Sequence, residues 1–114
     1  MLADIDDSCQ KAGVYPDVFL SAHSHNYQRH MRTIQVNGHP KVVPYLVVGG
    51  GGRGLTTVQP AHNQPVGDRV FAHSHHGFGF VTVAASRNEI VVNYSSVPSP
   101  GTTPDADTVI VPIV

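Results

Sequence analysis

Two histidines separated by a single residue are the feature of this chain best suited to chemistry. His23 and His25 follow a short apolar run, residues 18–20, that is typical of a β-strand. A strand that ends at such a pair places both imidazoles at its carboxyl edge, where a loop can turn them toward one point. Imidazole is the commonest protein ligand for zinc and similar cations. The spacing therefore predicts that His23 and His25 are metal ligands; the alternative is a pair of polar loop residues that bond only to backbone.

Two neighbouring residues carry groups suited to an anion. Tyr27 offers a hydroxyl, and Arg29 offers a planar guanidinium that matches the oxygens of a phosphate group. We predict that Arg29 and Tyr27 bind substrate, while the alternative is that the tyrosine only packs behind the site. The sequence identifies no residue of this chain as a catalytic acid, base or nucleophile.

Residues 16–29 resemble the last metal-binding motif of the calcineurin-like metallophosphoesterases. The closest branch is that of the purple acid phosphatases, in which the motif reads Gly-His-X-His-X-Tyr-X-Arg. Residues 44–52 are similar to that family's strand into a Gly-Gly loop, and residues 77–81 to its late Gly-aromatic strand. The resemblance covers roughly residues 1–96. One local departure is Ala22, which stands where the family has Gly and therefore bears on the shape of the loop.

The resemblance implies a phosphoester hydrolase that uses two divalent or mixed-valence transition metals, either iron, zinc or manganese. Two such cations about 3.5–4 Å apart would activate a water for attack on a phosphomonoester or phosphodiester. By similarity His23 would ligate one metal and His25 the other. The family's Asp-X-His, Gly-Asp-X-X-Asp and Gly-Asn-His-Glu/Asp motifs do not occur here. The chain therefore looks like the carboxyl-terminal portion of such a domain, with residues 1–114 forming a single unit.

Metal sites normally use at least three protein ligands, so two histidines alone make an incomplete site. We expect the isolated chain to be inactive and to hold metal weakly or not at all. A different class of function also fits the sequence, namely a non-catalytic β-rich module whose histidines bind a metal or mediate an interaction. The sequence encoded just upstream of Met1 would distinguish the two, because the missing motifs should lie there if the first is right.

Composition narrows the partners further. The 114 residues are 40% hydrophobic and only 13% charged, with a net charge of −1, so bulk electrostatics predicts neither nucleic-acid nor membrane-surface binding. Cys9 is the single cysteine, which excludes an intrachain disulfide. No apolar run approaches the roughly 18 residues of a membrane span, and the acidic amino end is unlike an ordinary secretory signal. The compartment stays unknown.

The periodicity predicts a β-rich α+β fold with one amino-terminal helix and about six strands, part of a metallophosphoesterase-type β-sandwich. The helix spans residues 2–12 and stops at Gly13. The predicted strands are 17–21, then 31–36 and 41–48 as a hairpin around Asn37-Gly38, then 78–85 and 89–94 as a second hairpin, and finally 108–114.

For most of the remaining glycines and histidines, we favour a structural interpretation over a functional one. The tetraglycine run 49–52 favours backbone packed close to its neighbours over a phosphate cradle, within a loop that continues to about Asp68. His73, His75 and His76 are predicted to form a loop of partly exposed residues, with a second metal site as the alternative. We expect His30, His39, His62 and Arg53 at the surface. Apolar residues on both faces of 43–48 and 78–84 predict self-association, or cover by the missing amino-terminal half.

Overall fold

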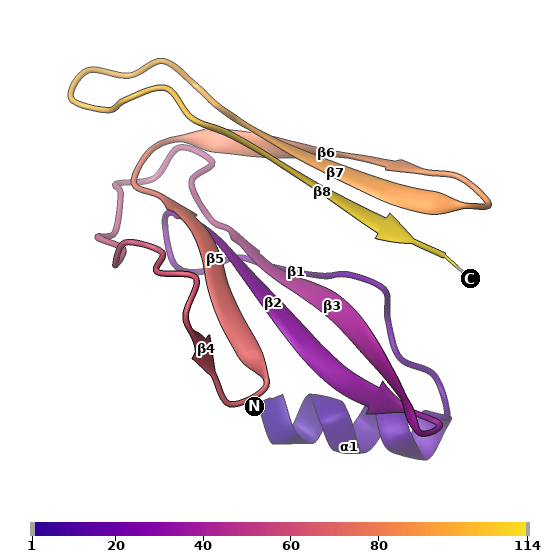
Figure 1. The fold of residues 1–114 in the computed structure, drawn as a ribbon. Helices are drawn as coiled ribbons and strands as arrows, with labels where there is room; N and C mark the ends of the chain where they lie inside the picture. The colour runs from indigo at the N-terminus through magenta and orange to yellow at the C-terminus, as the bar shows by residue number, and fades with distance from the viewer. Residues whose placement is uncertain (1, 114) are drawn as a thin grey trace.

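The computed structural model describes residues 2–113, which form one helix and eight strands in two sheets (Figure 1). The predicted β-rich α+β class is confirmed, with eight strands instead of about six. The helix is α1 (Leu2–Ala12), and the strands are β1 (Phe19–Ser21), β2 (Tyr27–Val36), β3 (His39–Val48), β4 (Pro65–Val66), β5 (Arg69–His75), β6 (Gly79–Ala85), β7 (Glu89–Ser96) and β8 (Ala106–Pro112).

The larger sheet has five strands in the order β1-β3-β2-β5-β4. Its centre is the predicted hairpin of β2 and β3, which turns at Asn37 and Gly38 with φ of 51° and 78°. These left-handed conformations suit a tight hairpin turn whose twist matches that of the strands. Because β2 begins at Tyr27, the residues Tyr27 and Arg29 lie in a strand and not in the preceding loop.

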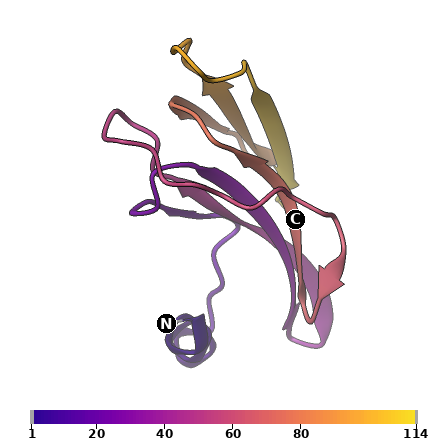
Figure 2. The same cartoon turned by 90° about the vertical axis from the view of Figure 1, so that its left-hand side faces the viewer.

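The smaller sheet is the antiparallel meander β6-β7-β8, and it stacks on one face of the larger sheet as a second layer (Figure 2). The core between the layers contains Leu46 from β3, Val92 from β7, and Val109 and Val111 from β8. These residues are at most 7% exposed. Alternation along β2 directs Tyr27 and Arg29 into this inter-sheet space and sends His30 and Arg32 to the opposite face.

Strand β5 was missed because its inward positions are histidines, so it lacks the apolar alternation typical of a half-buried strand. Nε2 of His73 lies 2.7 Å from Asp105 Oδ2. His75 is 8% exposed, with Nδ1 2.9 Å from the Tyr94 hydroxyl and Nε2 2.8 Å from Thr103 O. The prediction of a partly exposed loop is therefore wrong in conformation for both residues, and wrong in exposure for His75.

The predictions for the other histidines are also partly right and partly wrong. His39 and His62 are exposed, as predicted. His30 is half-buried and stacks on Phe71 of β5, with ring centroids 4.4 Å apart, so its prediction as a surface residue is wrong. Burial, together with the charge of Arg69, lowers the pKa of His30.

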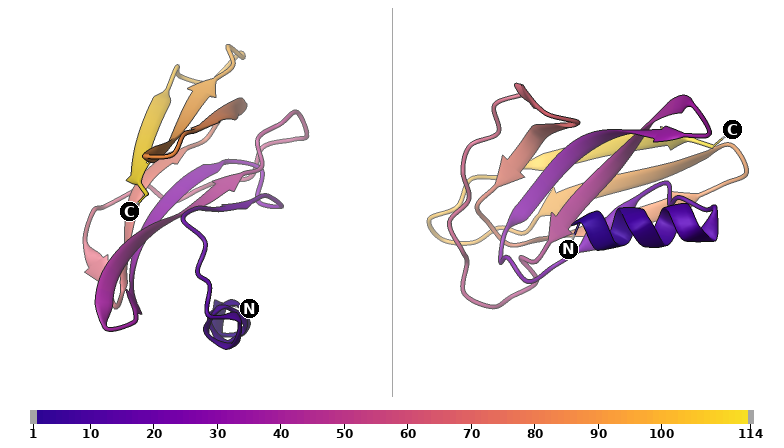
Figure 3. Two further views of the ribbon diagram at one scale, coloured as in Figure 1. Left: turned by 90° about the vertical axis from the view of Figure 1, so that its right-hand side faces the viewer. Right: turned by 90° about the horizontal axis from the view of Figure 1, so that it is seen from below.

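Helix α1 ends where predicted, at Gly13 with φ of 68°, but it stands apart from the sheet and buries none of its residues (Figure 3). Two cavities of about 530 Å³ and 380 Å³ lie along the helix and the outer face of the larger sheet. The outer face is thus far less covered than the inner one. Within residues 2–113, no helix combines the length and apolar character that crossing a membrane requires.

Candidate functional site

Three loops meet at the end of the sheets that lies away from α1 in Figure 1. Gly49 N donates to Asn26 O at 3.0 Å, and Thr56 N donates to His25 O at 3.0 Å, which joins the histidine loop to the glycine loop. Gly79 N donates to Gly50 O at 3.1 Å and adds the loop after β5. The three segments that resemble metallophosphoesterase motifs are therefore neighbours in space.

The first two glycines of the run 49–52 are required by packing. A Cβ on Gly49 would lie 1.9 Å from Ser24 O, and one on Gly50 would lie 2.7 Å from Gly77 O. Backbone contact this close admits no side chain. The preferred interpretation of the tetraglycine run, close packing of backbone, is confirmed at these two positions. Gly51 differs, since a Cβ there would meet nothing within 4 Å.

His25 is held by the glycine loop in one orientation. Its Nδ1 lies 2.7 Å from Gly54 O, a contact that a ring with its proton on Nδ1 makes as donor. That tautomer leaves the lone pair of Nε2 available, which is the arrangement of histidines that ligate metals through Nε2. Thr56 completes the attachment, because its hydroxyl accepts from His25 N at 3.3 Å.

His23 is exposed and has a φ of 79°, which is uncommon for a residue other than glycine. Such strained residues occur preferentially at functional sites. Ala22 does not adopt a positive φ, so alanine causes no strain at the position where the resembled motif has glycine. Convergence of the His23 and His25 rings on a shared centre stays a prediction.

His76 also lies in this region, although it was not predicted to do so. Its Nδ1 lies 3.1 Å from Thr56 O, an oxygen that also accepts from Asn26 Nδ2 at 3.2 Å. The available signal was its position directly before the Gly-aromatic segment 77–81. Arg53 is exposed on the glycine loop, as predicted. Across residues 2–113, however, no three His, Cys, Asp or Glu side chains are grouped to hold a metal ion.

Tyr27 and Arg29 share a partner that sequence reasoning missed, Asp107 of β8. Arg29 donates from Nε to Oδ2 at 2.7 Å and from Nη2 to Oδ1 at 3.1 Å, and the Tyr27 hydroxyl donates to Oδ2 at 2.7 Å. Tyr27 also stacks on Tyr94 with ring centroids 3.9 Å apart. The cluster ties β2 to β8 between the sheets. A role of Tyr27 and Arg29 in substrate binding stays a prediction.

The electrostatics of this cluster favour one protonation state. Burial opposes ionisation of Asp107, but hydrogen bonds from Arg29 and Tyr27 outweigh it, so the pKa of Asp107 is below its ordinary value. The bond to Asp107 raises the pKa of Arg29, and burial raises the pKa of Tyr27 far above its usual range. The cluster is a carboxylate, a guanidinium and a neutral phenol at any physiological pH.

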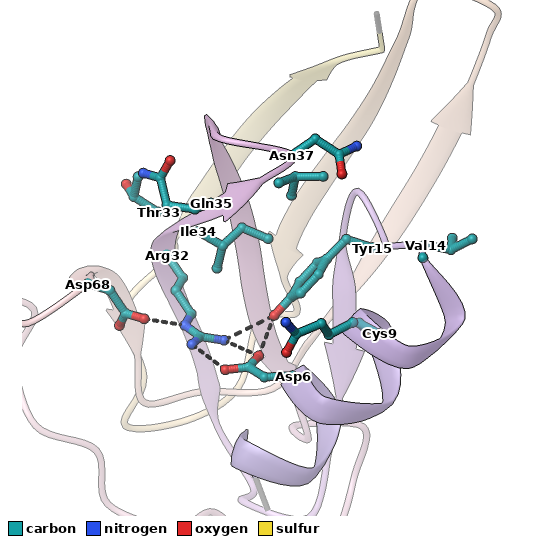
Figure 4. A pocket seen from close by; sticks show the side chains of 13 residues that line it. Asp6, Cys9, Val14, Tyr15, Arg32, Thr33, Ile34, Gln35, Asn37 and Asp68 are labelled. Carbon is teal, nitrogen blue, oxygen red and sulfur yellow. Dashed lines mark hydrogen bonds and ion pairs between the residues drawn. The ribbon is translucent and has the colours of Figure 1, made fainter.

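A second charged cluster lies between α1 and the larger sheet, around Arg32 (Figure 4). Arg32 Nη2 lies 2.6 Å from Asp6 Oδ2, and Nε lies 2.7 Å from Asp68 Oδ2. Tyr15 donates to Asp6 and is itself within 3.2 Å of Arg32 Nη1. The bond to Arg32 lowers the pKa of Asp6 to about 2. Because the guanidinium and Asp6 are paired, this cluster serves to attach the helix, although it borders the 530 Å³ cavity.

Comparisons of this chain with protein-family models, with curated proteins and with solved structures found no match. Its function has to be inferred from the residues and geometry of the chain itself.

Proposed function

We propose that this chain is part of a binuclear metal-dependent phosphoesterase, to which it contributes His23 and His25 as metal ligands. The observation that carries the proposal is the contact between His25 Nδ1 and Gly54 O, because it presents Nε2 for ligation. Two further features support it. His23 has a strained backbone, and the loops that resemble the family's motifs are joined by hydrogen bonds at this point.

Bound metals would supply an activated water for hydrolysis of a phosphomonoester or phosphodiester. The residues of this chain would orient the site and receive the substrate. Gly54 fixes the ring of His25, and Gly49 holds the histidine loop against the end of β3. The exposed guanidinium of Arg53 offers a positive charge to the phosphate. Arg29 would have to share its donors with Asp107 to contact substrate, so its first role is to fix the start of β2.

The site fits half of a binuclear centre. Two imidazoles provide nitrogen ligands that suit iron, zinc or manganese, but residues 2–113 group no third ligand with them. Further ligands would come from an amino-terminal half or another chain that packs on the outer face of the larger sheet. The isolated chain is therefore expected to bind metal weakly and to lack turnover.

A zinc titration of the purified chain, followed by NMR signals of the histidine rings, tests this proposal. We expect zinc to perturb His23 and His25 first and to bind more weakly to His25→Ala. His39→Ala is the matched control, because His39 is exposed at the start of β3, in the hairpin away from the glycine loop. Zinc binding that is unchanged in both His23→Ala and His25→Ala would contradict the proposal.

The same samples separate the proposal from the alternative, a non-catalytic metal-binding or interaction module. Inorganic phosphate added to the zinc-loaded chain should perturb His25 and Arg53 if the site accepts a phosphoester. Zinc binding that depends on His25 but is indifferent to phosphate would favour the module. Assays with 4-nitrophenyl phosphate and iron, zinc or manganese should show no turnover; metal-dependent turnover abolished by His23→Ala would overturn the expected inactivity.

A further inference from the structure

A cavity of about 510 Å³ opens beside the glycine loop. The backbone of Gly50, Gly51 and Gly52 forms one side, and Phe78, Phe80, Val97 and Pro98 contribute the apolar side chains. Among residues 2–113, no charged side chain lines it. Its size falls within the range of small-molecule pockets, which are mostly apolar.

Protein packing explains only part of the glycine side of this cavity. Gly49 and Gly50 have no room for a side chain, whereas a Cβ on Gly51 or Gly52 would face open space; at Gly52 the φ of 142° favours glycine by itself. The bare backbone at these two positions lets a flat group approach more closely than any side chain would permit. At Gly51 neither close packing nor a positive φ requires glycine, so the bare backbone there is available to a group that packs on it from outside.

The aromatic side of the cavity is equally unusual. Phe80 is 51% exposed and Val97 is 44% exposed, so two large apolar side chains meet water at its rim. Hydrogen bonds hold these walls in place, with Val97 N donating to Phe78 O at 2.8 Å and Gly79 N to Gly50 O at 3.1 Å. The walls are thus fixed before any ligand binds, and their aromatic rings favour another ring as partner.

The glycine loop connects the cavity to the proposed phosphoesterase site along the chain. Residues 50–52 line the cavity, and two residues further along Gly54 O holds the ring of His25. Arg53, between them, is exposed and cationic. An uncharged cavity does not compensate a phosphate for the water it would lose, whereas the far end of the loop offers imidazoles and a guanidinium to one.

We propose that this cavity binds the aromatic ring of an aryl phosphoester whose phosphate lies at the His23–His25 loop. The inference rests on the proposed function, which it deepens by naming the esterifying alcohol as aromatic. The ring packs between the backbone of Gly51–Gly52 and the side chains of Phe78 and Phe80. Aryl esters are therefore preferred to alkyl esters of the same charge.

The test compares phenyl phosphate with methyl phosphate in NMR titrations of the zinc-loaded full chain. Phenyl phosphate should bind about tenfold more tightly than methyl phosphate and should shift the amide of Gly51 and the ring of Phe80. Phe80→Ala should reduce that preference about three- to tenfold. Val83→Ala is the matched control, since Val83 lies on the same strand, is 50% exposed and does not line the cavity.

Gly51→Ala provides a second variant in case Phe80→Ala does not fold. The added methyl group meets no protein atom within 4 Å, so it should leave the chain folded and weaken phenyl phosphate alone. The inference would be overturned if methyl phosphate perturbs His25, phenyl phosphate binds with the same affinity as methyl phosphate, and neither variant changes that affinity. The proposed function would then still stand. Phenol could instead shift the NMR signals of Phe80, with the shift lost in Gly51→Ala, while neither ester perturbs His25. That outcome would support the ring site and contradict the proposed function.

Discussion

Strand β2 carries two arginines on opposite faces, and their surroundings differ sharply. Arg29 points between the sheets, where it and Asp107 retain 18% and 8% exposure of their side chains. Arg32 points toward α1; its own side chain is 11% exposed, but its partners Asp6 and Asp68 are 36% and 38% exposed. Water screens the outer pairs far more than the inner one. The inner pair therefore acts on the stacking of the sheets, and the outer pairs act on the attachment of one helix.

The same asymmetry extends across the whole larger sheet. Its inner face closes on a core of aliphatic side chains, whereas its outer face has a helix without buried residues and two cavities beside it. The packing contacts that stabilise a sheet with such different faces lie mainly on its inner side. The outer side is where we expect a further layer of protein to pack.

Breaking the inner pair should have the largest effect. Asp107→Ala leaves the buried guanidinium of Arg29 and the hydroxyl of Tyr27 without their acceptor, which should lower the free energy of unfolding by about 3 kcal/mol. Urea denaturation measures the change. Asp7→Ala removes a carboxylate that is 59% exposed and pairs with Lys11, and it should change stability by less than about 0.5 kcal/mol. Equal effects of the two substitutions would show that the inner pair contributes no more than an exposed pair on the helix surface.

The glycine loop offers a second contrast, between positions closed and open to a side chain. Gly49→Ala forces a Cβ against Ser24 O and should lower the free energy of unfolding by about 2 kcal/mol, with displacement of the histidine loop. Gly51→Ala meets no protein atom and should leave stability unchanged. Thermal unfolding and the NMR signals of His25 report on both. A neutral Gly49→Ala would show that the two loops are not packed as described.

A smaller and pH-dependent effect is expected for the outer cluster. The pKa of Asp6 is lowered from 3.8 to about 2, so its pairing with Arg32 stabilises the folded chain fully above pH 3.8 and is lost as the pH falls toward 2. Amide exchange of α1 should therefore accelerate between pH 4 and 2. Asp6→Asn should accelerate it already at pH 6 and flatten the pH dependence. If the rate of amide exchange in α1 changes with neither pH nor this substitution, Arg32 does not hold the helix.

Local patterns predicted most of the fold because they depend on neighbours in sequence. Asn37-Gly38 has the conformation that its turn requires, and the helix stops at Gly13. Strand β5 was missed because its inward side chains are histidines whose partners, Tyr94 and Asp105, lie 19 and 32 residues away. No local pattern shows that a polar side chain will be satisfied across a sheet interface.

In the candidate site, too, local patterns predict some residues and miss those that distant contacts bring together. Spacing alone predicts His25 as a ligand, and its contact with Gly54 adds an orientation that spacing does not contain. Asp107 was not found, because the residues it joins, Tyr27 and Arg29, are 80 and 78 positions away. His76 reaches the site only because the loop after β5 returns to Thr56. Residues brought together by topology have to be seen in the folded chain.

The smallest expected effect concerns the outer face itself. Leu20 is 52% exposed on β1 and borders the 380 Å³ cavity, so we expect the chain to self-associate weakly through this face at tens of micromolar. Leu20→Lys should shift the sedimentation behaviour to that of a monomer. Val66→Lys is the control, because Val66 is 63% exposed on β4 at the opposite edge of the same sheet. A monodisperse monomer at these concentrations would show that the outer face is stable in water as it stands, and the contrast with the inner face would then be one of chemistry and not of missing cover.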